Sequence, residues 1–152
     1  MEARRYATQD RDACLLLFDS NTPEYFLPQE RVQFEAWLDS NPEHYFVLEH
    51  DGLIVACGGF ALPPSGSTMA SLTWGMVGRQ WRRQGLGRFL LMFRMREMSK
   101  SGAEIQMVNL ETTPQAAPFF ASQGFQTARV IKDGYAPGLD KLQMVRKMAV
   151  CP

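Results

Sequence analysis

Apolar residues recur along the chain with two different spacings, one typical of strands and one typical of helices. Short alternating or continuous apolar runs, bounded by turn residues, predict strands. These runs are residues 2–7, 45–50, 53–60, 69–77, 104–111, 125–133 and 142–150. Apolar residues spaced three or four apart predict helices. These segments are residues 8–19, 29–40, 85–99 and 114–124.

Turn residues mark the boundaries between these elements. Asp51-Gly52 separates two strand-like runs and is a strong signal for a β-hairpin. Pro114 is expected in the first turn of its helix, where a missing N–H is tolerated, and Gly124 is expected to close that helix. Residues 134–140 are expected to form the loop between the last two strands.

The order of elements predicts the fold class. Three strands follow two helices, and a strand–helix–strand crossover then leads to a further helix and a final strand pair. Hairpins combined with one crossover imply a mixed sheet with helices on its faces, which places the chain in the α/β class. A length of 152 residues suits a single domain, 1–152, with one sizeable core.

Composition narrows the function classes. The formal net charge is zero, so neither nucleic acid nor an anionic membrane is the expected partner. The three cysteines, Cys14, Cys57 and Cys151, are far apart and suggest neither a disulfide framework nor a metal site. Residues 1–10 lack the apolar core of a secretion signal, and no run reaches the length of a membrane span. We therefore expect a reduced, cytoplasmic protein.

The most informative stretch is residues 81–95, "WRRQGLGRFLLMFRM". Gly85 and Gly87 stand where a strand would turn into a helix, and four arginines, at positions 79, 82, 83 and 88, surround them. Unpaired N–H groups and the helix dipole at such a point can bind phosphate, and glycine lets the backbone approach the ligand closely. The plainer interpretation is a solvated, basic start of a helix.

Two well-known phosphate loops do not fit this stretch. The P-loop needs a Gly-Lys-Ser or Gly-Lys-Thr ending, which this sequence lacks. The dinucleotide fingerprint needs a third glycine three residues after the second, and that position is Leu90.

A third pattern does fit. Residues 82–87, "RRQGLG", resemble the [Q/R]-x-x-G-x-[G/A] signature of the GCN5-related N-acetyltransferase (GNAT) family. The segment "LETTPQAAPFFASQGF" resembles the second half of that family, where a strand leads into a helix that ends in Gly-Phe. The order of the other strands matches as well, so the resemblance covers nearly the whole chain. It implies a central, mostly antiparallel sheet of six or seven strands, with one parallel, splayed pair and helices on both faces.

The resemblance also implies a cofactor site. Members of the family use acetyl-CoA or another acyl-CoA as co-substrate. The N–H groups from Arg83 to Arg88 would hold the pyrophosphate, and an N–H near Val77 would polarise the thioester carbonyl. The pantetheine arm would lie where the strand ending at Val77 splays from the strand ending near Glu111. The residues predicted for this site are Met76, Val77, Arg82, Arg83, Gln84, Gly85, Leu86, Gly87, Arg88 and Phe120.

The implied chemistry is direct transfer of the acyl group to an amine, which requires proton transfer. Many family members have a tyrosine acid four residues before the Gly-Phe glycine, but here that position is Phe120, so Tyr135 or a water would have to substitute. Glu111 is the first candidate for the base, although an ordinary strand-end carboxylate is the plainer interpretation. Glu24 and Tyr25 lie in a loop that borders the acceptor in the family, but a solvated loop would contain such residues too.

The sequence therefore supports two functions. The first is acetyl-CoA-dependent transfer of an acyl group to a primary amine of a small or amino-acid-like molecule. The second is a regulatory module that binds acyl-CoA without catalysis, which Phe120 favours. The expected partner is a small-molecule amine, with a homodimer left open and no metal expected.

Overall fold

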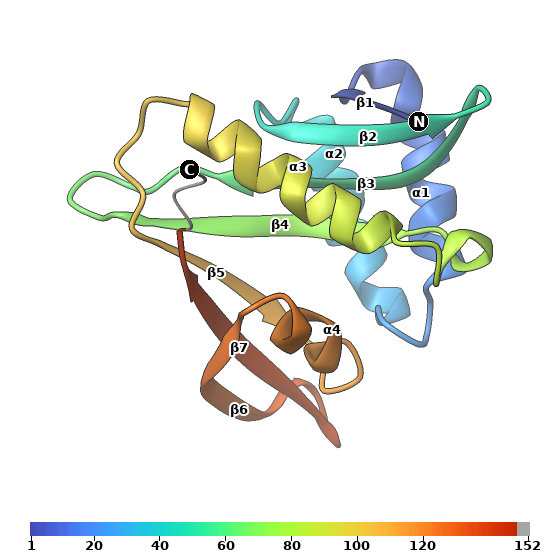
Figure 1. The fold of residues 1–152 in the computed structure, drawn as a ribbon. Helices are drawn as coiled ribbons and strands as arrows, with labels where there is room; N and C mark the ends of the chain where they lie inside the picture. Colours follow the sequence, from blue (N-terminus) through green and yellow to red (C-terminus); the bar gives the residue numbers. More distant parts are fainter. Residues whose placement is uncertain (149–152) are drawn as a thin grey trace. The chain divides into compact units, whose positions relative to one another are not determined.

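The computed structural model describes residues 1–148, whose strands form a mixed seven-stranded sheet (Figure 1). The order across the sheet is β1-β2-β3-β4-β5-β7-β6. The strands are β1 (Glu2–Arg5), β2 (Tyr45–His50), β3 (Leu53–Ala61), β4 (Met69–Val77), β5 (Met107–Thr112), β6 (Gln126–Ala136) and β7 (Leu139–Lys147). The α-helices are α1 (Arg11–Ser20), α2 (Arg31–Asp39), α3 (Leu86–Lys100) and α4 (Ala117–Ser122). Short 3₁₀ turns are η1 (Thr8–Asp10), η2 (Pro28–Glu30) and η3 (Arg79–Trp81).

The pairing of the strands confirms the predicted fold class. Strands β1 and β2, β2 and β3, β5 and β7, and β6 and β7 pair antiparallel. Strands β4 and β5 form the parallel pair, in which Met69–Ser71 lie opposite Met107–Asn109. The splaying of the ends of this pair stays a prediction.

The chain divides into two compact units. The first unit consists of residues 1–60 and 73–97, and the second of residues 61–72 and the chain from Met98 onward. Strand β4 contributes its first four residues to the second unit and its remaining residues to the first. The loop that contains Gly85 and leads into α3 at Gly87, called the glycine loop below, belongs to the first unit. Glu111, Phe120 and Tyr135 belong to the second.

The hairpin between β2 and β3 forms as the sequence predicts. Asp51 and Gly52 both adopt left-handed backbone conformations, with φ values of 50° and 78°. A two-residue loop with positive φ at both positions matches the twist of the flanking strands. The pairing of His50 with Leu53 closes this turn.

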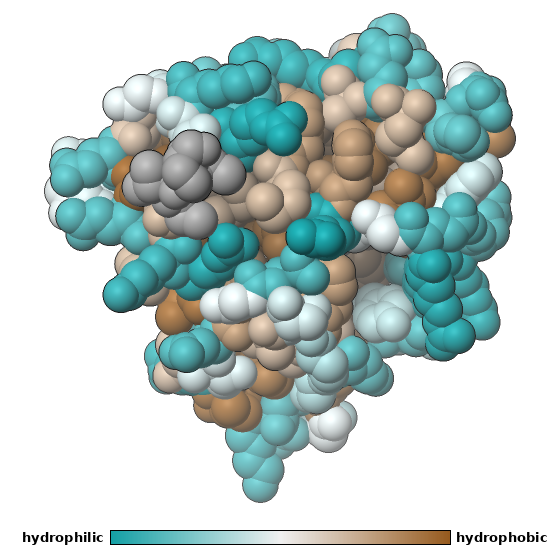
Figure 2. Space-filling view, viewed as in Figure 1, coloured by the Kyte–Doolittle hydropathy of each residue, from teal (hydrophilic) through white to brown (hydrophobic). Residues whose placement is uncertain are grey.

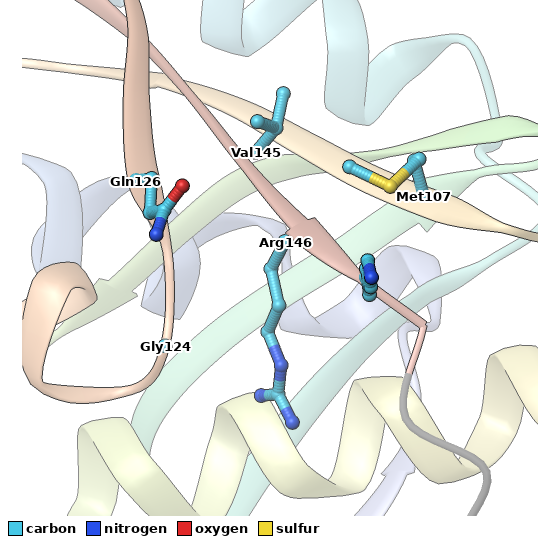
Figure 3. Close-up of a pocket in the computed structure, with 6 residues that line it drawn as sticks. Met107, Gly124, Gln126, Val145 and Arg146 are labelled. Carbon is cyan, nitrogen blue, oxygen red and sulfur yellow. The ribbon is translucent and has the colours of Figure 1, made fainter.

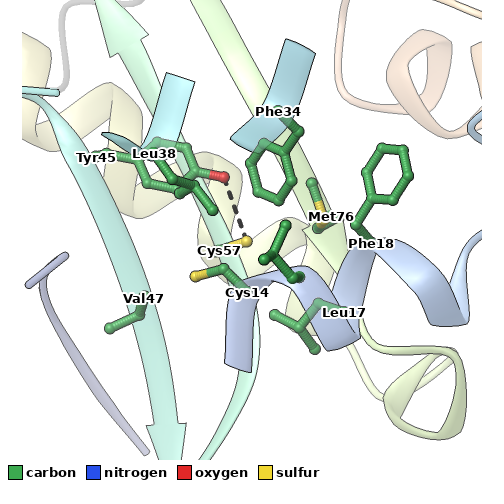
Figure 4. Close-up of a cluster of buried hydrophobic side chains, with 10 residues drawn as sticks. Cys14, Leu17, Phe18, Phe34, Leu38, Tyr45, Val47, Cys57 and Met76 are labelled. Carbon is green, nitrogen blue, oxygen red and sulfur yellow. Dashed lines mark hydrogen bonds between the residues drawn. The ribbon is translucent and has the colours of Figure 1, made fainter. Parts of the chain in front are cut away.

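In the first unit, apolar residues of α1 and α2 pack on one face of the strands (Figure 4). Phe18 from α1 and Phe34 from α2 stack with ring centroids 5.6 Å apart, and both side chains are fully buried. Tyr45 of β2 and Cys57 of β3 complete the cluster from the sheet. Cys57 is therefore a small buried residue, whereas Cys151 lies outside the described residues.

Helix α3 packs on the opposite face of the same strands. Leu86 and Leu90 contact a second cluster that contains Leu48, Val55 and Ala56. Burial of a leucine side chain contributes about 1.5–3 kcal/mol, so this cluster fixes the beginning of α3 against the sheet. Helices thus cover both faces of the first unit, as predicted (Figure 1).

The carboxylate of Asp10, just before α1, binds groups outside that helix. Asp10 stands at the N-cap position, but its carboxylate makes no capping bond to α1. Instead it accepts hydrogen bonds from Arg4 Nη1 and Nη2, at 2.8 and 2.9 Å, and from the Ala7 N–H at 2.8 Å. The bond from Arg4 is the largest cause that lowers the pKa of Asp10 below its ordinary value.

Two predicted boundaries in the second unit are wrong. Helix α4 begins at Ala117, and Pro114 instead lies in the preceding turn, where the Ala117 N–H donates to the Thr113 carbonyl. Residues 134–140 are not a loop, because β6 and β7 extend through most of that segment and leave only Pro137-Gly138 between them. Gly138 has a φ of 80°, which allows so tight a turn. Residues 149 and 150 of the predicted last strand lie outside the described residues.

The face in Figure 2 carries polar residues with apolar ones between them. On α3, Phe89 and Met92 are among the exposed large apolar side chains. None of the helices in residues 1–148 has the length and hydropathy that a membrane span requires.

Candidate active site

The predicted glycine loop connects β4 to α3 in the first unit. Arg83 and Gly85 have φ values of 63° and 80°, so two of three consecutive residues adopt a left-handed backbone conformation. Successive turns of this kind direct backbone N–H groups into a concavity that can bind an anion. A Cβ added at Gly85 would meet no atom within 4 Å, so the space beside this glycine is open.

The beginning of α3 presents N–H donors that have no partner within the helix. The Phe89 N–H donates to the Gly85 carbonyl at 3.0 Å. The N–H groups of residues 86–88 therefore precede the first intrahelical bond and have no partner within the helix. The side chains of Arg83 and Arg88 are exposed, whereas that of Leu86 is buried in the core. The loop thus combines a fixed helix start with accessible positive charge.

Contacts with α1 and β3 fix the end of the glycine loop that follows β4. The Gly78 N–H donates to the Val55 carbonyl at 2.9 Å, and the Arg79 N–H donates to Ser20 Oγ at 3.2 Å. A Cβ at Gly78 would lie 3.0 Å from Leu17 Cδ2, so a larger residue would force the loop away from α1.

The side chain of Arg82 connects the glycine loop to the segment that follows α1 through hydrogen bonds and a ring contact. Its Nη1 donates to Glu24 Oε1 at 3.1 Å, and its Cζ lies 4.4 Å from the centroid of the Tyr25 ring. Its Nη2 donates to Asn21 Oδ1. Asn21 is buried and in turn donates to the Val77 carbonyl at 3.0 Å. Arg82 and its three partners, Asn21, Glu24 and Tyr25, are called the Arg82 cluster below.

The Arg82 cluster brings together three residues that the sequence singled out separately. Glu24 and Tyr25 were predicted for the acceptor side, and Arg82 for the cofactor side. Asn21 was missed, because a polar residue at the end of a helix is typical of any turn. Arg82 differs from Arg83 and Arg88, since protein groups already surround its guanidinium.

Strand β4 bends just before the glycine loop. Trp74 has a φ of 40°, a left-handed conformation that costs about 1–3 kcal/mol for a residue with a side chain. The Tyr45 hydroxyl donates to the Trp74 carbonyl at 2.7 Å, and the Trp74 ring packs 5.0 Å from that of Phe34. These contacts offset the strain. Gly75, the next residue, is exposed although Met76 after it is buried.

In the second unit, Lys141 brings Glu111 and Tyr135 together. Its Nζ lies 3.9 Å from Glu111 Oε2 and 5.0 Å from the centroid of the Tyr135 ring. Gln143 Nε2 also donates to Glu111 Oε2, at 3.3 Å. The Glu111 side chain is half exposed, as access to a substrate would require.

Phe120 lies on α4 among other aromatic rings. Its centroid is 5.1 Å from that of Phe119 and 5.9 Å from that of Phe125, both edge to face. A hydrocarbon ring has no proton to donate, so this position supplies no acid.

A hollow of about 430 Å³ in the second unit contains none of the predicted site residues (Figure 3). It is lined by Met107, Gly124, Gln126, Val145, Arg146 and Lys147. Within residues 1–148, His, Cys, Asp and Glu side chains form no group of three that could hold a metal ion.

Comparison with known proteins decides the family. The model of the acetyltransferase (GNAT) family matches residues 12–125, well over half of the chain. The chain belongs to the GNAT acetyltransferase family. This GNAT protein is therefore an enzyme of a family that uses acyl-CoA, and the predicted resemblance to that family is confirmed. No curated protein gives a significant sequence match.

Solved structures share the fold of this GNAT protein. A Desulfovibrio desulfuricans protein assigned to the GNAT family is 22% identical, with a TM-score of 0.82 and coverage of 97% of this chain and 99% of its own. The ribosomal-protein-S18-alanine N-acetyltransferase of Escherichia coli is 22% identical, with a TM-score of 0.76 and coverage of 99% and 96%. An aminoglycoside 6'-N-acetyltransferase complexed with coenzyme A is 15% identical, with a TM-score of 0.79 and coverage of 100% and 99%. At these identities the likeness shows the fold alone.

Proposed function

We propose that this GNAT protein transfers the acetyl group of acetyl-CoA to a primary amine of a small or amino-acid-like molecule. The glycine loop is the observation that carries the proposal. It combines the left-handed residues Arg83 and Gly85, the N–H groups at the start of α3 that have no partner within the helix, and open space beside Gly85. These features fit the pyrophosphate of a CoA molecule, because they present several donors and positive charge to one anion.

Each part of the loop would have its own task. The backbone N–H groups of residues 83–88 would bind the pyrophosphate, and Gly87 would leave room for it. The exposed side chains of Arg83 and Arg88 would add long-range attraction. Arg82 would act through the Arg82 cluster, where it already has partners. The backbone of Met76 and Val77 would align the acyl end.

Acetyl-CoA supplies an activated acyl carbon, at which a C–N bond to the amine forms while the C–S bond breaks. The amine loses a proton and the departing sulfur gains one, so the protein must manage two proton transfers. We assign the first to Glu111, whose carboxylate is half exposed and held by Gln143 and Lys141. We assign the second to Tyr135 or to a water, because Phe120 has no proton to give.

The acceptor is proposed from charge. Glu24 lies in the loop that borders the acceptor in the family, and its carboxylate would attract an amine in its protonated form, which sheds that proton before the neutral amine attacks. The similar structures include an enzyme named for a ribosomal protein and one named for an aminoglycoside. The acceptor panel should therefore contain polyamines, amino-acid amides, an aminoglycoside and a peptide with N-terminal alanine.

A thiol-release assay tests the proposal. When the protein is incubated with acetyl-CoA and each amine in turn, at least one amine should cause release of free CoA. Mass spectrometry should then show that this amine has gained one acetyl group. Tight binding of acetyl-CoA without thiol release from any amine would instead support the non-catalytic module that Phe120 suggests. Absence of both binding and release would refute the proposed function.

A further inference from the structure

Arg94 on α3 is a buried cation with an unsatisfied hydrogen-bond donor. Its side chain is 4% exposed. Its Nη1 donates to the Gly59 carbonyl at a long 3.3 Å, and its Nε has no hydrogen-bond partner among the described residues. Burial lowers the pKa of its guanidinium below its ordinary value to about 10, so the group stays charged at neutral pH. A buried charge with an unsatisfied donor is unfavourable for stability alone.

Two glycines make the space that this guanidinium occupies. A Cβ added at Gly75 of β4 would lie 2.9 Å from Arg94 Nη1 and 3.0 Å from Nη2. A Cβ added at Gly58 of β3 would lie 3.3 Å from Arg94 Cζ. Any other residue at Gly75 would therefore displace the cation. The guanidinium thus lies directly against the backbone of β4.

The point of contact is the bend in β4. Trp74 has its left-handed conformation there, and Gly75 is exposed. Thr73 Oγ1, one residue before the bend, is also buried and has no hydrogen-bond partner among the described residues. Tyr45, whose pKa burial raises well above 10, is a neutral phenol that donates to the Trp74 carbonyl. Two unsatisfied polar groups beside one strained and accessible strand segment indicate a site adapted to a ligand rather than to stability.

We propose that Arg94 is a positioning residue for acyl transfer, which maintains the bend of β4 at Trp74-Gly75 and places a fixed positive charge behind it. The proposal rests on the proposed function, in which the N–H groups of β4 near Val77 polarise the thioester carbonyl. Gly75 precedes Val77 by two residues, about 7 Å along a strand. A charge at that range in a buried environment stabilises the negative charge that develops on the carbonyl oxygen.

The test compares Arg94→Met with Arg96→Met. Methionine approximates the length of arginine without its charge, and Arg96 is an exposed arginine two residues further along the same helix. We expect Arg94→Met to keep or raise the unfolding temperature, because an apolar group replaces a buried charge with an unsatisfied donor. We also expect kcat to fall about 10- to 100-fold, somewhat less than the loss of a direct oxyanion donor, with the affinity for acetyl-CoA within a few-fold of the parent. Arg96→Met should match the parent in kcat and in affinity for acetyl-CoA.

Isotope-edited infrared spectroscopy gives a readout that does not depend on turnover. The carbonyl stretch of bound ¹³C-acetyl-CoA should lie at lower frequency in the parent and in Arg96→Met than in Arg94→Met. Arg94→Lys keeps the charge, so its carbonyl frequency should lie between that of the parent and that of Arg94→Met. If Arg94→Met does not fold, Arg94→Gln provides the neutral variant for both measurements.

The outcomes separate the two proposals. If the parent neither binds acetyl-CoA nor acetylates any amine, the proposed function fails, and this inference fails with it. If the parent is active but the neutral variant has the parent's kcat and carbonyl frequency, Arg94 serves the fold alone and the inference is overturned. A neutral variant with lower stability, unchanged kcat and unchanged frequency would overturn it in the same way.

Discussion

Arg82→Ala should destabilise the protein, although the side chain looks like a surface arginine in the sequence. The ion pair with Glu24 is partly exposed, at 22% and 45% for the two side chains, and should contribute only about 0.5 kcal/mol. The cation–π contact with Tyr25 should add about 0.5–1 kcal/mol. Loss of the bond to buried Asn21 should cost about 1–2 kcal/mol, because its Oδ1 is left without a donor.

These contributions share one guanidinium and do not simply add, so we expect a total of about 2 kcal/mol. At about 2–4 °C per kcal/mol for a protein of this size, the unfolding temperature should fall by about 4–8 °C. Differential scanning calorimetry measures the fall. Arg83→Ala is the matched control, because the side chain of Arg83 is exposed and its removal should change the temperature by less than about 2 °C.

A double-mutant cycle tests the reasoning behind the number. If Arg82 and Asn21 act through their mutual hydrogen bond, Arg82→Ala and Asn21→Ala should be coupled by about 1 kcal/mol. Additive effects, or equal unfolding temperatures for Arg82→Ala and Arg83→Ala, would refute the Arg82 cluster as a structural link. In the active enzyme, Arg82→Ala should also raise the KM for the amine more than the KM for acetyl-CoA.

Three further predictions concern charge, proton transfer and pH. The affinity for CoA should fall as salt rises, because exposed charges are screened over about 10 Å at 0.1 M, and Arg83→Ala should flatten that dependence in a calorimetric titration. A salt-independent affinity would show that the arginines form only a solvated surface. Phe120→Tyr should speed turnover if thiolate protonation limits the rate, and Glu111→Gln should slow it at neutral pH by about 10²–10⁴-fold; coincident pH–rate profiles would rule out both roles. The pKa of Asp10 is lower in the folded than in the unfolded protein. Its stabilisation is therefore present above the unfolded value of about 3.8 and disappears as the pH falls through the folded one. Asp10→Asn should accordingly be less stable than the parent at about pH 6, and the difference should narrow as the pH falls below about 3.8, as urea unfolding can show.

The sequence predicted the elements that depend on local pattern. The hairpin at Asp51-Gly52 follows from two residues that tolerate positive φ, and the parallel pair follows from the crossover through α3. The segment 134–140 was misassigned, because Gly134 and Pro137 suggest a loop although strand pairing extends the regular structure on both sides. Pairing between distant residues outweighs local turn signals in such a segment.

The sequence could not reveal the bend of β4 or the Arg82 cluster. Trp74 looks like an ordinary strand residue, because a left-handed tryptophan occurs only where distant contacts such as the Tyr45 hydroxyl stabilise it. Arg94 looks like a solvated position on α3, since arginine is rarely buried. Arg82 and Glu24 are far apart in the chain, and only folding shows that they are partners.

Calorimetric titration of CoA into the parent and into Gly87→Val tests the central claim most directly. Valine in the first turn of α3 should leave the helix intact, since glycine is already among the poorest helix formers, and its side chain would project where the pyrophosphate should lie. Met92→Val, at an exposed position of the same helix, is the matched control. We predict that the parent and Met92→Val bind CoA alike and that folded Gly87→Val binds it at least about tenfold more weakly, which corresponds to about 1.4 kcal/mol. Equal affinity in the two folded variants, or no binding by the parent, would contradict the assignment of the glycine loop as the acyl-CoA site.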